Sequence, residues 1–524
     1  MMTEVDPDPG HLQPETMGPG GRMPAAQAVA RFTPTASIVP PSPHRTSALG
    51  SNSRGPVLRI PTNLHFVGIG GVGMSAVASV WHDLNGRSSG TDLHVSATVR
   101  RLCEQGIAVG IGHDAKHLEP LLTEGRPVHA GLVVSTAVPQ DNPELMEARR
   151  LGMPIFHRSE ILAALMTGHR SVAVSGTHGK TTTTGMLGTL LIEAGADPTL
   201  LIGGDLPAIG GNARTGQGPW LVAEADESDK SMQRLTADWV ILTNLEGDHL
   251  EHYRDLDEIL DTMATWISRL PAHAVVIACI DDPGVRTLLP RLERTIVTYG
   301  FSPEADHRIT TEALSGAGSM FEMDGIKWQV GVPGRHNICN AAAALVTAME
   351  MGFSPETLEA GLPRFKGVGR RFQDRGTVAG VQILEDYAHH PSEIKATLAA
   401  AKLLNRPIWV IFQPHRYSRT TALFGDFARA FDEASGVAFL DIYGAGEAPT
   451  EVSSSQLADA VRQGNPDLKV CYWPDPQRAA NQAETLVQPG DLLILMGAGN
   501  VNRLAEPLLE ALEARAQAAA KPSA

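Results

Sequence analysis

The chain has 524 residues, of which 43% are hydrophobic and 19% are charged, and its formal net charge is −15. This composition is typical of a globular enzyme and excludes a fibrous or fully disordered chain, while the negative charge argues against a broad nucleic-acid-binding face. No apolar run approaches the ~18 residues that a membrane span needs, so we expect neither nucleic acid nor membrane as a partner. At roughly 100–200 residues per domain, the length predicts about three domains.

The first 55 residues are predicted to form a disordered tail that is dispensable for chemistry. They hold nine of the 36 prolines, and they offer too little apolar surface to offset the entropy lost on ordering. They also lack the apolar segment of a secretory signal. The four cysteines have neither metal-ligand nor redox spacing, which favours reduced thiols and a cytoplasmic location: Cys103, Cys279, Cys339 and Cys471.

Beyond the tail, short apolar runs alternate with helical patterns in three successive series. Such alternation predicts parallel α/β sheets, and we place the domains at residues 56–156, 157–364 and 365–524. Ligands of such sheets bind at the carboxyl ends of the strands. The candidate site residues therefore include those that directly follow apolar runs: Gly68, Gly176, Glu224, Asn244, Asp386 and His415.

A glycine-rich turn follows the first apolar run. Gly68, Gly70 and Gly73 have the spacing G-x-G-x-x-G, and Asp92 lies about twenty residues further on. Such glycines let the backbone approach a pyrophosphate at a helix N-terminus, where amide groups and the helix dipole favour anions. The turn therefore indicates the diphosphate of a nucleotide more firmly than it indicates NAD, and a purely structural turn is the alternative.

The stretch SVAVSGTHGKTTTT, residues 171–184, is similar to a phosphate-binding loop but is two residues shorter than the pattern G-x-x-x-x-G-K-[ST]. Its two glycines, Gly176 and Gly179, permit a tight backbone turn around phosphate oxygens. Lys180 offers a positive charge to the β and γ phosphates, and Thr181 offers a hydroxyl to Mg²⁺. By itself the loop indicates a phosphate site.

Two further metal-ligand candidates follow the next apolar runs. Glu224 ends the run WLVAE, and His249 lies in TNLEGDHLEHY. A carboxylate at the end of a strand beside such a loop is a natural Mg²⁺ ligand. Imidazole suits softer metals, so Asp248 is the alternative to His249. Taken alone, each of these residues is more commonly a solvated charge or a structural polar side chain.

Polar segments in the last third of the chain form another group. Asn337 suits the edge of an adenine, and Asp386 suits ribose hydroxyls. Arg371 suits phosphate or carboxylate, and Arg416 with Arg419 suits an anionic substrate group. A helix cap at Asn337, an N-cap at Asp386 and solvated arginines remain open as structural alternatives. The segments are HNICNAAAA (336–344), GRRF (369–372), EDYAHHPSE (385–393) and FQPHRYSRT (412–420).

Taken together, the motifs resemble those of the Mur ligases of peptidoglycan synthesis, from about residue 60 to residue 510. Within that family the chain is most similar to the branch that adds L-alanine to UDP-N-acetylmuramate. Its HRYSRT segment resembles that branch. It also has no lysine that we can assign to the carbamoylated lysine that other branches use near the metal. The motifs follow the family's order: GTHGKTTT (176–183), EADESD (224–229), TNLEGDH (243–249), PGRHNICNAAAA (333–344), GRRF (369–372), DYAHHP (386–391) and FQPHRYSRT (412–420).

The resemblance implies a three-domain α/β fold and an ATP-dependent ligase. The N-terminal domain would be Rossmann-like and bind the UDP-sugar, the central domain would be a P-loop-type ATPase domain, and the C-terminal domain would again be Rossmann-like. ATP, with Mg²⁺ or Mn²⁺, would convert the lactyl carboxylate of UDP-N-acetylmuramate into an acyl phosphate, which the amine of L-alanine attacks. The protein would act as a monomer or homodimer.

The resemblance also implies roles for individual residues. Lys180, Glu224 and His249 would be catalytic, and Thr181, Glu224 and His249 would hold the metal. ATP would be bound by Gly176, Thr177, His178, Gly179, Lys180, Thr181, Thr182, Asn337, Asn340, Arg371 and Asp386. The UDP-sugar or alanine would be bound by Gly68, Gly70, Gly71, Gly73, Asp92, Ser135, Tyr387, His415, Arg416 and Arg419.

Several other functions remain as alternatives. Ala388 stands where many members have Gly, and Glu385 where Asp is common; the recycling ligase, which attaches a ready-made tripeptide to the same sugar nucleotide, is similar there. A folate-type polyglutamate ligase is a further alternative within the ligases. Two alternatives are not ligases. One is a nicotinamide-dependent oxidoreductase, which would leave the GTHGKTTTT loop without a function. The other is a non-catalytic nucleotide sensor.

Overall fold

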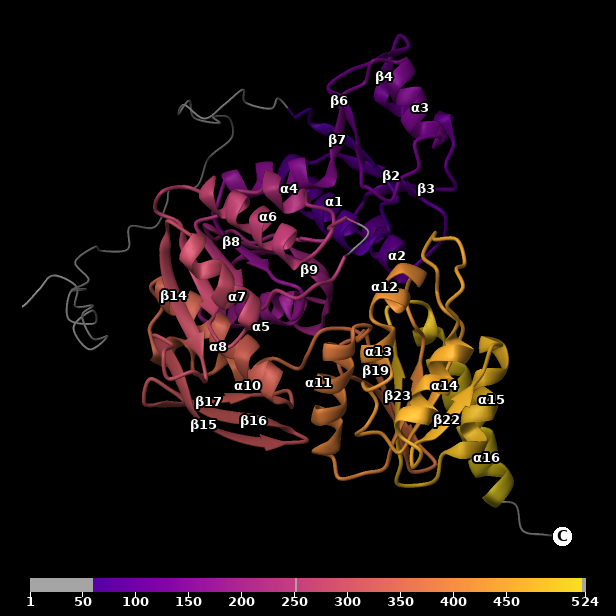
Figure 1. The fold of residues 1–524 in the computed structure, drawn as a ribbon. Coiled ribbons are helices and arrows are strands. Elements are labelled where there is room, and N and C mark those ends of the chain that lie inside the picture. Colours follow the sequence, from indigo (N-terminus) through magenta and orange to yellow (C-terminus); the bar gives the residue numbers. More distant parts are fainter. Residues whose placement is uncertain (1–59, 250–251, 521–524) are drawn as a thin grey trace, which may run out of the picture. The chain divides into compact units, whose positions relative to one another are not determined.

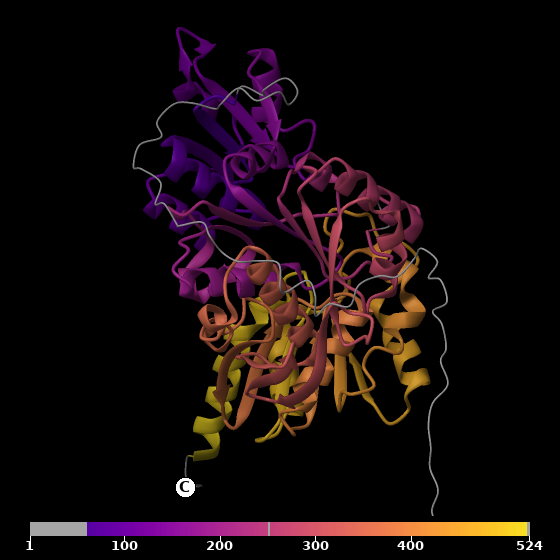
Figure 2. The same ribbon diagram turned by 90° about the vertical axis from the view of Figure 1, so that its left-hand side faces the viewer.

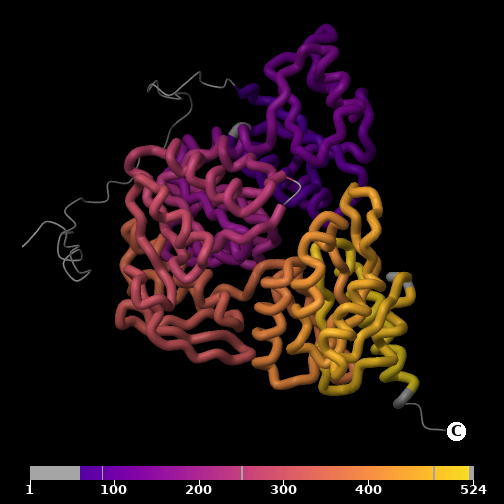
Figure 3. The backbone as a smooth tube through the Cα atoms, viewed as in Figure 1, coloured from indigo at the N-terminus to yellow at the C-terminus, as the bar shows by residue number. Residues whose placement is uncertain are grey.

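The structure is a computed structural model that describes residues 60–249 and 252–520 (Figure 1). The predicted tail of residues 1–55 lies outside the described residues. Three large sheets follow one another along the chain, and each is built from one continuous part of it (Figure 3). The predicted α/β class is confirmed. Within the described ranges, no helix combines the length and apolarity that crossing a membrane requires.

The first sheet is wholly parallel, with the strand order β3-β2-β1-β6-β7. Its core strand β1 buries Leu64 and Phe66, and helix α1 packs Ala76, Val77 and Val80 into the same core. The elements are β1 (Asn63–Val67), α1 (Val72–Asn85), β2 (Ser88–Asp92), α2 (Ala97–Glu104), β3 (Ala108–Ile111), β6 (Ala130–Val134), α3 (Pro143–Arg150) and β7 (Ile155–His157), and α4 (Arg158–Thr167) leads out of the sheet.

The second sheet has ten strands in the order β10-β9-β11-β8-β12-β13-β14-β15-β16-β17. Its central strands are parallel and buried on both faces: Val172 and Val174 of β8 pack into one core, and Ala173 packs into another. This explains why these strands read as continuous apolar runs. The parallel elements are β8 (Arg170–Ser175), α5 (Lys180–Glu193), β9 (Thr199–Leu206), β11 (Trp220–Glu224), β12 (Trp239–Leu242), α6 (Leu256–Ser268), β13 (Val275–Cys279), α7 (Pro283–Leu288), β14 (Thr295–Gly300) and α8 (Arg335–Glu350).

At both edges of this sheet the strands are antiparallel, although the alternation predicted parallel strands. β10 pairs antiparallel with β9, and β15, β16 and β17 form an antiparallel meander. The physical reason lies in short turns: Asp324 and Gly325 between β16 and β17 both have positive φ, the conformation of a tight hairpin turn. The bounds are β10 (Gly211–Arg214), β15 (His307–Ser315), β16 (Gly318–Met323) and β17 (Ile326–Val330).

The third sheet has the order β18-β19-β23-β20-β21-β22, with only β18 antiparallel. The apolar stretches VQILED, IWVIF, VAF and LLILM form its buried strands. The last helix, α16, contacts β18, and it is the yellow helix that leads to the C-terminus in Figure 2. The elements are β18 (Gln373–Val378), β19 (Val381–Asp386), α11 (Pro391–Lys402), β20 (Ile408–Phe412), α12 (Tyr417–Ala422), β21 (Gly436–Phe439), α14 (Ser454–Gly464), β22 (Lys469–Tyr472), α15 (Pro476–Leu486), β23 (Leu492–Met496) and α16 (Ala505–Ala520).

Candidate active site

The phosphate-loop candidate lies at a switch point of the central sheet. β8 stands between β11 and β12, so the loop after β8 meets the residues that follow its two neighbours at one edge. The amide of Thr177 donates to the carbonyl of Asn244 at 3.0 Å, and the amide of His178 donates to Oδ1 of Asn244 at 2.7 Å. Such switch points are where open α/β sheets bind ligands.

The two glycines of the loop have conformations and surroundings that exclude a side chain. Gly176 and Gly179 have φ of 129° and 82°. A Cβ on Gly179 would lie 2.5 Å from Oδ1 of Asn340, which also accepts a hydrogen bond from Oγ1 of Thr183 at 3.2 Å. The loop is therefore seated against helix α8, and glycine is required where it touches that helix.

Lys180 opens helix α5 and is held over the loop. Its Nζ donates to the carbonyls of Gly176 and Thr177 at 2.6 and 3.1 Å and to Oε1 of Glu227 at 2.9 Å. Burial opposes the charge of Lys180, but attraction to Glu227 and Asp226 outweighs it and raises the lysine pKa. Lys180 therefore carries its positive charge at the N-terminus of α5, where an anion is favoured.

The predicted metal ligands Thr181 and Glu224 are adjacent. Oγ1 of Thr181 donates to Oε2 of Glu224 at 3.2 Å, and the amide of Gly203 donates to the other carboxylate oxygen. Burial raises the pKa of Glu224 and outweighs the Gly203 amide and the charge of Lys180, which lower it. A hydroxyl and a carboxylate are hard oxygen donors, and they fit Mg²⁺.

His249 lies beside a different carboxylate. Its Nε2 is 3.5 Å from Oε1 of Glu227 and 3.6 Å from Oδ2 of Asp248. Asp248 itself is bound in a bidentate manner by Arg419, whose Nε and Nη2 donate at 2.9 and 3.1 Å. Burial works against the Asp248 charge, but the Arg419 guanidinium holds the pKa of that carboxyl well below its usual range. Both oxygens of Asp248 are therefore bonded to Arg419. Of the two residues, His249 is the better candidate for a metal ligand.

A cavity of 360 Å³ opens on one side of the loop. Asp386 lines it, but both its oxygens are already bonded within the protein: the amides of Phe372 and Ala388 donate at 2.7 and 2.8 Å, and Oγ1 of Thr397 donates at 3.2 Å. It is not an N-cap, since His390 caps α11. The cavity brings together most of the predicted ATP residues: His178, Gly179, Thr182, Asn337, Asn340, Arg371 and Asp386.

A larger cleft of 880 Å³ opens on the other side of Lys180. It shares His178, Arg371 and Glu393 with the smaller cavity, so the two meet at the loop. His415 lies in it with a pKa lowered to about 4, through burial and the charges of Arg419 and Arg416. Predicted residues from all three sheets line the cleft: Gly73, Thr177, His178, Lys180, Thr181, Glu224, His249, Arg371, Tyr387, His415, Arg416 and Arg419.

The glycine turn of the first sheet is arranged differently from the prediction for a dinucleotide site. The amide of Gly70 donates to Oδ2 of Asp92 at 2.8 Å, so Asp92 closes on the turn itself. A Cβ on Gly73 would collide with Nη1 of Arg158, which places a guanidinium at the start of α1. Of the predicted UDP-sugar residues, these line neither cavity: Gly68, Gly70, Gly71, Asp92 and Ser135.

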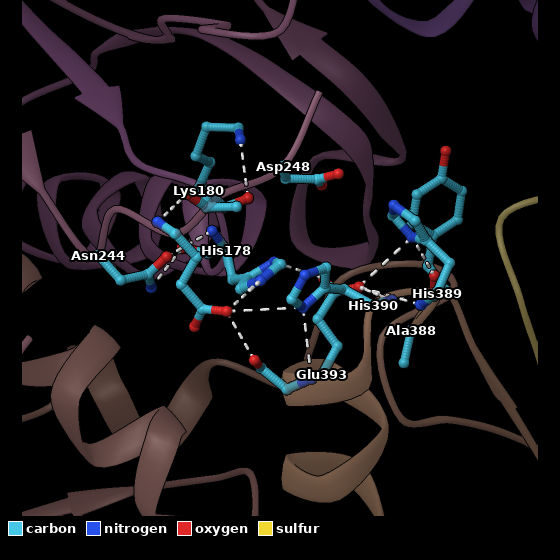
Figure 4. Close-up of polar contacts among 12 residues, drawn as sticks. His178, Lys180, Asn244, Asp248, Ala388, His389, His390 and Glu393 are labelled. Carbon is cyan, nitrogen blue, oxygen red and sulfur yellow. Dashed lines mark hydrogen bonds and ion pairs between the residues drawn. The ribbon is translucent and has the colours of Figure 1, made fainter. Parts of the chain in front are cut away.

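His178 is a hub between the loop and the third sheet (Figure 4). Its Nδ1 is 3.3 Å from Oε1 of Glu393, and its Nε2 is 3.7 Å from Oε2 of Glu246. Burial disfavours its charge, but Glu393 and Glu246 outweigh this and raise the pKa of His178 to about 9. Nη1 of Arg371 donates to the same oxygen of Glu393 at 3.1 Å. The hub thereby fixes helix α11 against the loop.

Comparison with known proteins decides the family. Three models match in succession: the Mur ligase family catalytic domain over residues 63–170, the Mur ligase middle domain over 174–348 and the Mur ligase glutamate ligase domain over 370–499. The chain belongs to the Mur ligase family. Being a ligase, it is not the nicotinamide-dependent oxidoreductase considered above, and Mur ligases depend on ATP.

Individual relatives of this Mur ligase match along nearly their whole length. The UDP-N-acetylmuramate–L-alanine ligase of Syntrophotalea carbinolica is 43% identical over 86% of this chain and 98% of its own, and that of Solidesulfovibrio magneticus is 44% identical over 85% and 97%. The crystal structure of the UDP-N-acetylmuramate–alanine ligase MurC from Thermotoga maritima matches with a TM-score of 0.72 and 27% identity, over 87% of this chain and 99% of that one. The murein peptide ligase of Psychrobacter arcticus, at 23% identity and a TM-score of 0.66, shares the fold.

The sequence patterns missed several residues of this Mur ligase's site. Glu227, the carboxylate partner of Lys180, lies in the EADESD segment three residues after Glu224, and its place in that acidic run was the available signal. Glu246 and Glu393 both lie beside His178. Because they belong to different sheets, no local spacing indicates that they are neighbours.

Replacing Gly179 with alanine separates the effect of backbone strain from the effect of the contact with α8. In Gly179→Ala, we expect a loss of unfolding free energy of about 1–2 kcal/mol from the positive φ, and at least a tenfold rise in the KM for ATP because the new methyl group pushes Asn340 away. Gly195 is the matched control: it also has positive φ, 72°, at the other end of α5, with nothing within 4 Å of an added Cβ. Urea unfolding and ATP kinetics of both variants check this. Equal KM values would contradict the contact argument.

Proposed function

We propose that this Mur ligase joins the lactyl carboxylate of UDP-N-acetylmuramate to the amine of L-alanine, with ATP converted to ADP and phosphate, in peptidoglycan precursor synthesis. The observation that carries the proposal is the larger cleft. It unites the phosphate loop, the Thr181–Glu224 pair and the arginines of the third sheet on one continuous surface. Relatives that match over nearly their whole length bear the name of this activity.

The carboxylate needs ATP for a chemical reason. Direct attack of an amine on a carboxylate would have to expel oxide, which is a very poor leaving group. Transfer of the γ-phosphoryl group to a carboxylate oxygen forms an acyl phosphate, from which phosphate leaves readily. Such a transfer depends on positioning and on charge neutralisation rather than on covalent help from the protein. The two cavities, which share His178, Arg371 and Glu393, supply a place for each reactant on either side of the loop.

Lys180 is the residue placed to neutralise the transferring phosphoryl group. Its Nζ is held by two loop carbonyls and Glu227, so the charge is oriented before a nucleotide arrives, and a preorganised charge needs no reorganisation during the reaction. Thr181 and Glu224, with His249, would hold Mg²⁺. When bound, Mg²⁺ supplies further charge neutralisation for phosphate oxygens.

The third sheet supplies positive charge to the other side of the cleft. Arg416 and Arg419 line it beside His415, and Arg371 reaches it from the shared wall. Guanidinium groups bind carboxylates and phosphates in a bidentate manner, so Arg416 and Arg371 would hold the alanine carboxylate or the substrate phosphates. Arg419 already binds Asp248 in this manner and would position the wall of the cleft. Fixing the amine near the acyl phosphate converts a bimolecular step into an effectively unimolecular one.

An amino-acid panel tests the proposal. Phosphate release from ATP is measured with UDP-N-acetylmuramate and, in turn, L-alanine, glycine, L-serine or the free tripeptide that the recycling ligase attaches. We expect L-alanine to give the highest kcat/KM. Glycine should be about 10-fold or more slower, since one methyl group in a pocket discriminates by ~1–3 kcal/mol. Turnover with the tripeptide, together with only background release with L-alanine, would reassign the chain to the recycling reaction.

A further inference from the structure

A histidine–carboxylate cluster lies beside the smaller cavity, and two of its three members, Glu246 and His390, have no role in the proposed reaction. It consists of His178 from the phosphate loop, Glu246 from the segment after β12, and His390, the N-cap of α11. Among the described residues, their ligand atoms form a group within 4.8 Å of one another, and Figure 4 shows the rings of His178 and His390 next to each other. The cluster is distinct from the Thr181–Glu224 pair, because no residue is shared between them.

The three side chains converge on one oxygen. Oε2 of Glu246 lies 3.7 Å from Nε2 of His178 and 3.6 Å from Nδ1 of His390. Ligands around a tetrahedral Zn²⁺ with bonds of about 2.0–2.1 Å are separated by about 3.4 Å. The two separations to Oε2 are close to that value, and all three ligand atoms lie within 4.8 Å of one another. To bind an ion, Nδ1 of His390 exchanges the 3.3 Å hydrogen bond that it accepts from the Ser392 amide.

The polar groups around the cluster are those of a metal site. Nε2 of His178 is buried without a hydrogen-bond partner, while Nδ1 of the same ring faces Oε1 of Glu393 at 3.3 Å. A carboxylate on the second nitrogen fixes the ring and its tautomer, as in histidines that bind metals. Oγ of Ser392 donates to Oε2 of Glu246 at 2.6 Å, which orients the carboxylate.

We propose that Nε2 of His178, Nδ1 of His390 and Oε2 of Glu246 form a site for a transition-metal dication such as Zn²⁺. Two imidazoles and one carboxylate favour Zn²⁺ or Co²⁺ over Mg²⁺. The ion replaces the proton that otherwise bridges His178 to its carboxylates. Because Glu246 is one-third exposed and lines the nucleotide cavity, the ion reaches the site through that cavity, and it ties α11 to the phosphate loop.

Cobalt titration of the full-length protein tests the site. We expect one equivalent of Co²⁺ to give the visible absorption of a tetrahedral complex, which Zn²⁺ then removes by displacement. Glu246→Gln keeps the side-chain shape and the contact with Ser392, and His390→Ala removes a second ligand. Each should weaken Co²⁺ binding by at least ~10²-fold, more than the loss of a supporting hydrogen bond.

Two matched variants serve as controls. Glu224→Gln removes the predicted magnesium ligand, and His273→Ala removes an exposed histidine outside both cavities; both should retain the Co²⁺ absorption. Absence of the band in the wild type would overturn the proposal. So would a band that disappears in Glu224→Gln and persists in Glu246→Gln, because the ion would then sit at the phosphate loop. Circular dichroism establishes that each variant is folded.

Discussion

Lys180→Ala is expected to lower kcat by at least ~10²-fold, the effect of losing one preorganised charge that acts on the transition state. The Nζ is fixed by Gly176, Thr177 and Glu227, so its charge is preorganised in the loop. The substitution also leaves the buried carboxylate of Glu227 without its lysine, which adds to the loss. Steady-state phosphate release with saturating substrates measures the effect.

Lys230→Ala is the matched control for that experiment. Lys230 directly follows the acidic segment EADESD (224–229). It pairs with Glu258 at 2.6 Å and covers the ring of Tyr253, but it lines neither cavity. Its replacement should change kcat by less than twofold. Near-normal turnover in Lys180→Ala, or equal losses in both variants, would remove Lys180 from the mechanism.

Arg419→Ala is expected to lower the free energy of unfolding by about 3–5 kcal/mol, the cost of leaving one partner of a buried ion pair alone. Asp248 and Arg419 are 6% and 5% exposed and are joined by two hydrogen bonds. The remaining Asp248 carboxylate would be buried without a cation. Because the pair links the segment after β12 to helix α12, the loss should also reduce activity.

A double-mutant cycle isolates the pair. Asp248→Ala and Arg419→Ala are combined, and urea unfolding is followed for all four proteins. The double variant should be less destabilised than the sum of the single variants, by at least ~1.5 kcal/mol, since residues in direct contact are not additive. Additive losses would mean that the two residues contribute independently and that the ion pair does not hold the two elements together.

The local chemistry of the phosphate loop was predictable, because strand, glycine turn and helix N-terminus follow one another in the sequence. Lys180 and Thr181 occupy the predicted positions at the start of α5, and Glu224 ends β11. That β8 lies between β11 and β12 is a property of strand order. This strand order makes Thr181 and Glu224 neighbours. The resemblance to the Mur ligases implied that the two residues share a metal, but no spacing in the sequence indicates that they lie side by side.

Contacts between distant segments were not predictable. Ser392 binds Glu246 across 146 positions, and Arg419 binds Asp248 across 171, so their pairing depends on how whole sheets are placed. The turn at Gly70 has the spacing of a dinucleotide site. Asp92 accepts a hydrogen bond from the Gly70 amide of that turn, which the spacing does not predict. A pattern indicates which residues a fold needs, while the partner of each polar atom is set by tertiary packing.

Isotope transfer tests the central claim, phosphoryl transfer from ATP to the substrate carboxylate, most directly. UDP-N-acetylmuramate is prepared with heavy oxygen in its lactyl carboxylate, and the enzyme turns it over with ATP and L-alanine. If the carboxylate is activated as an acyl phosphate, one heavy oxygen moves from the carboxylate into each phosphate released, and mass spectrometry of the phosphate detects it. Product formation accompanied by unlabelled phosphate would contradict the account.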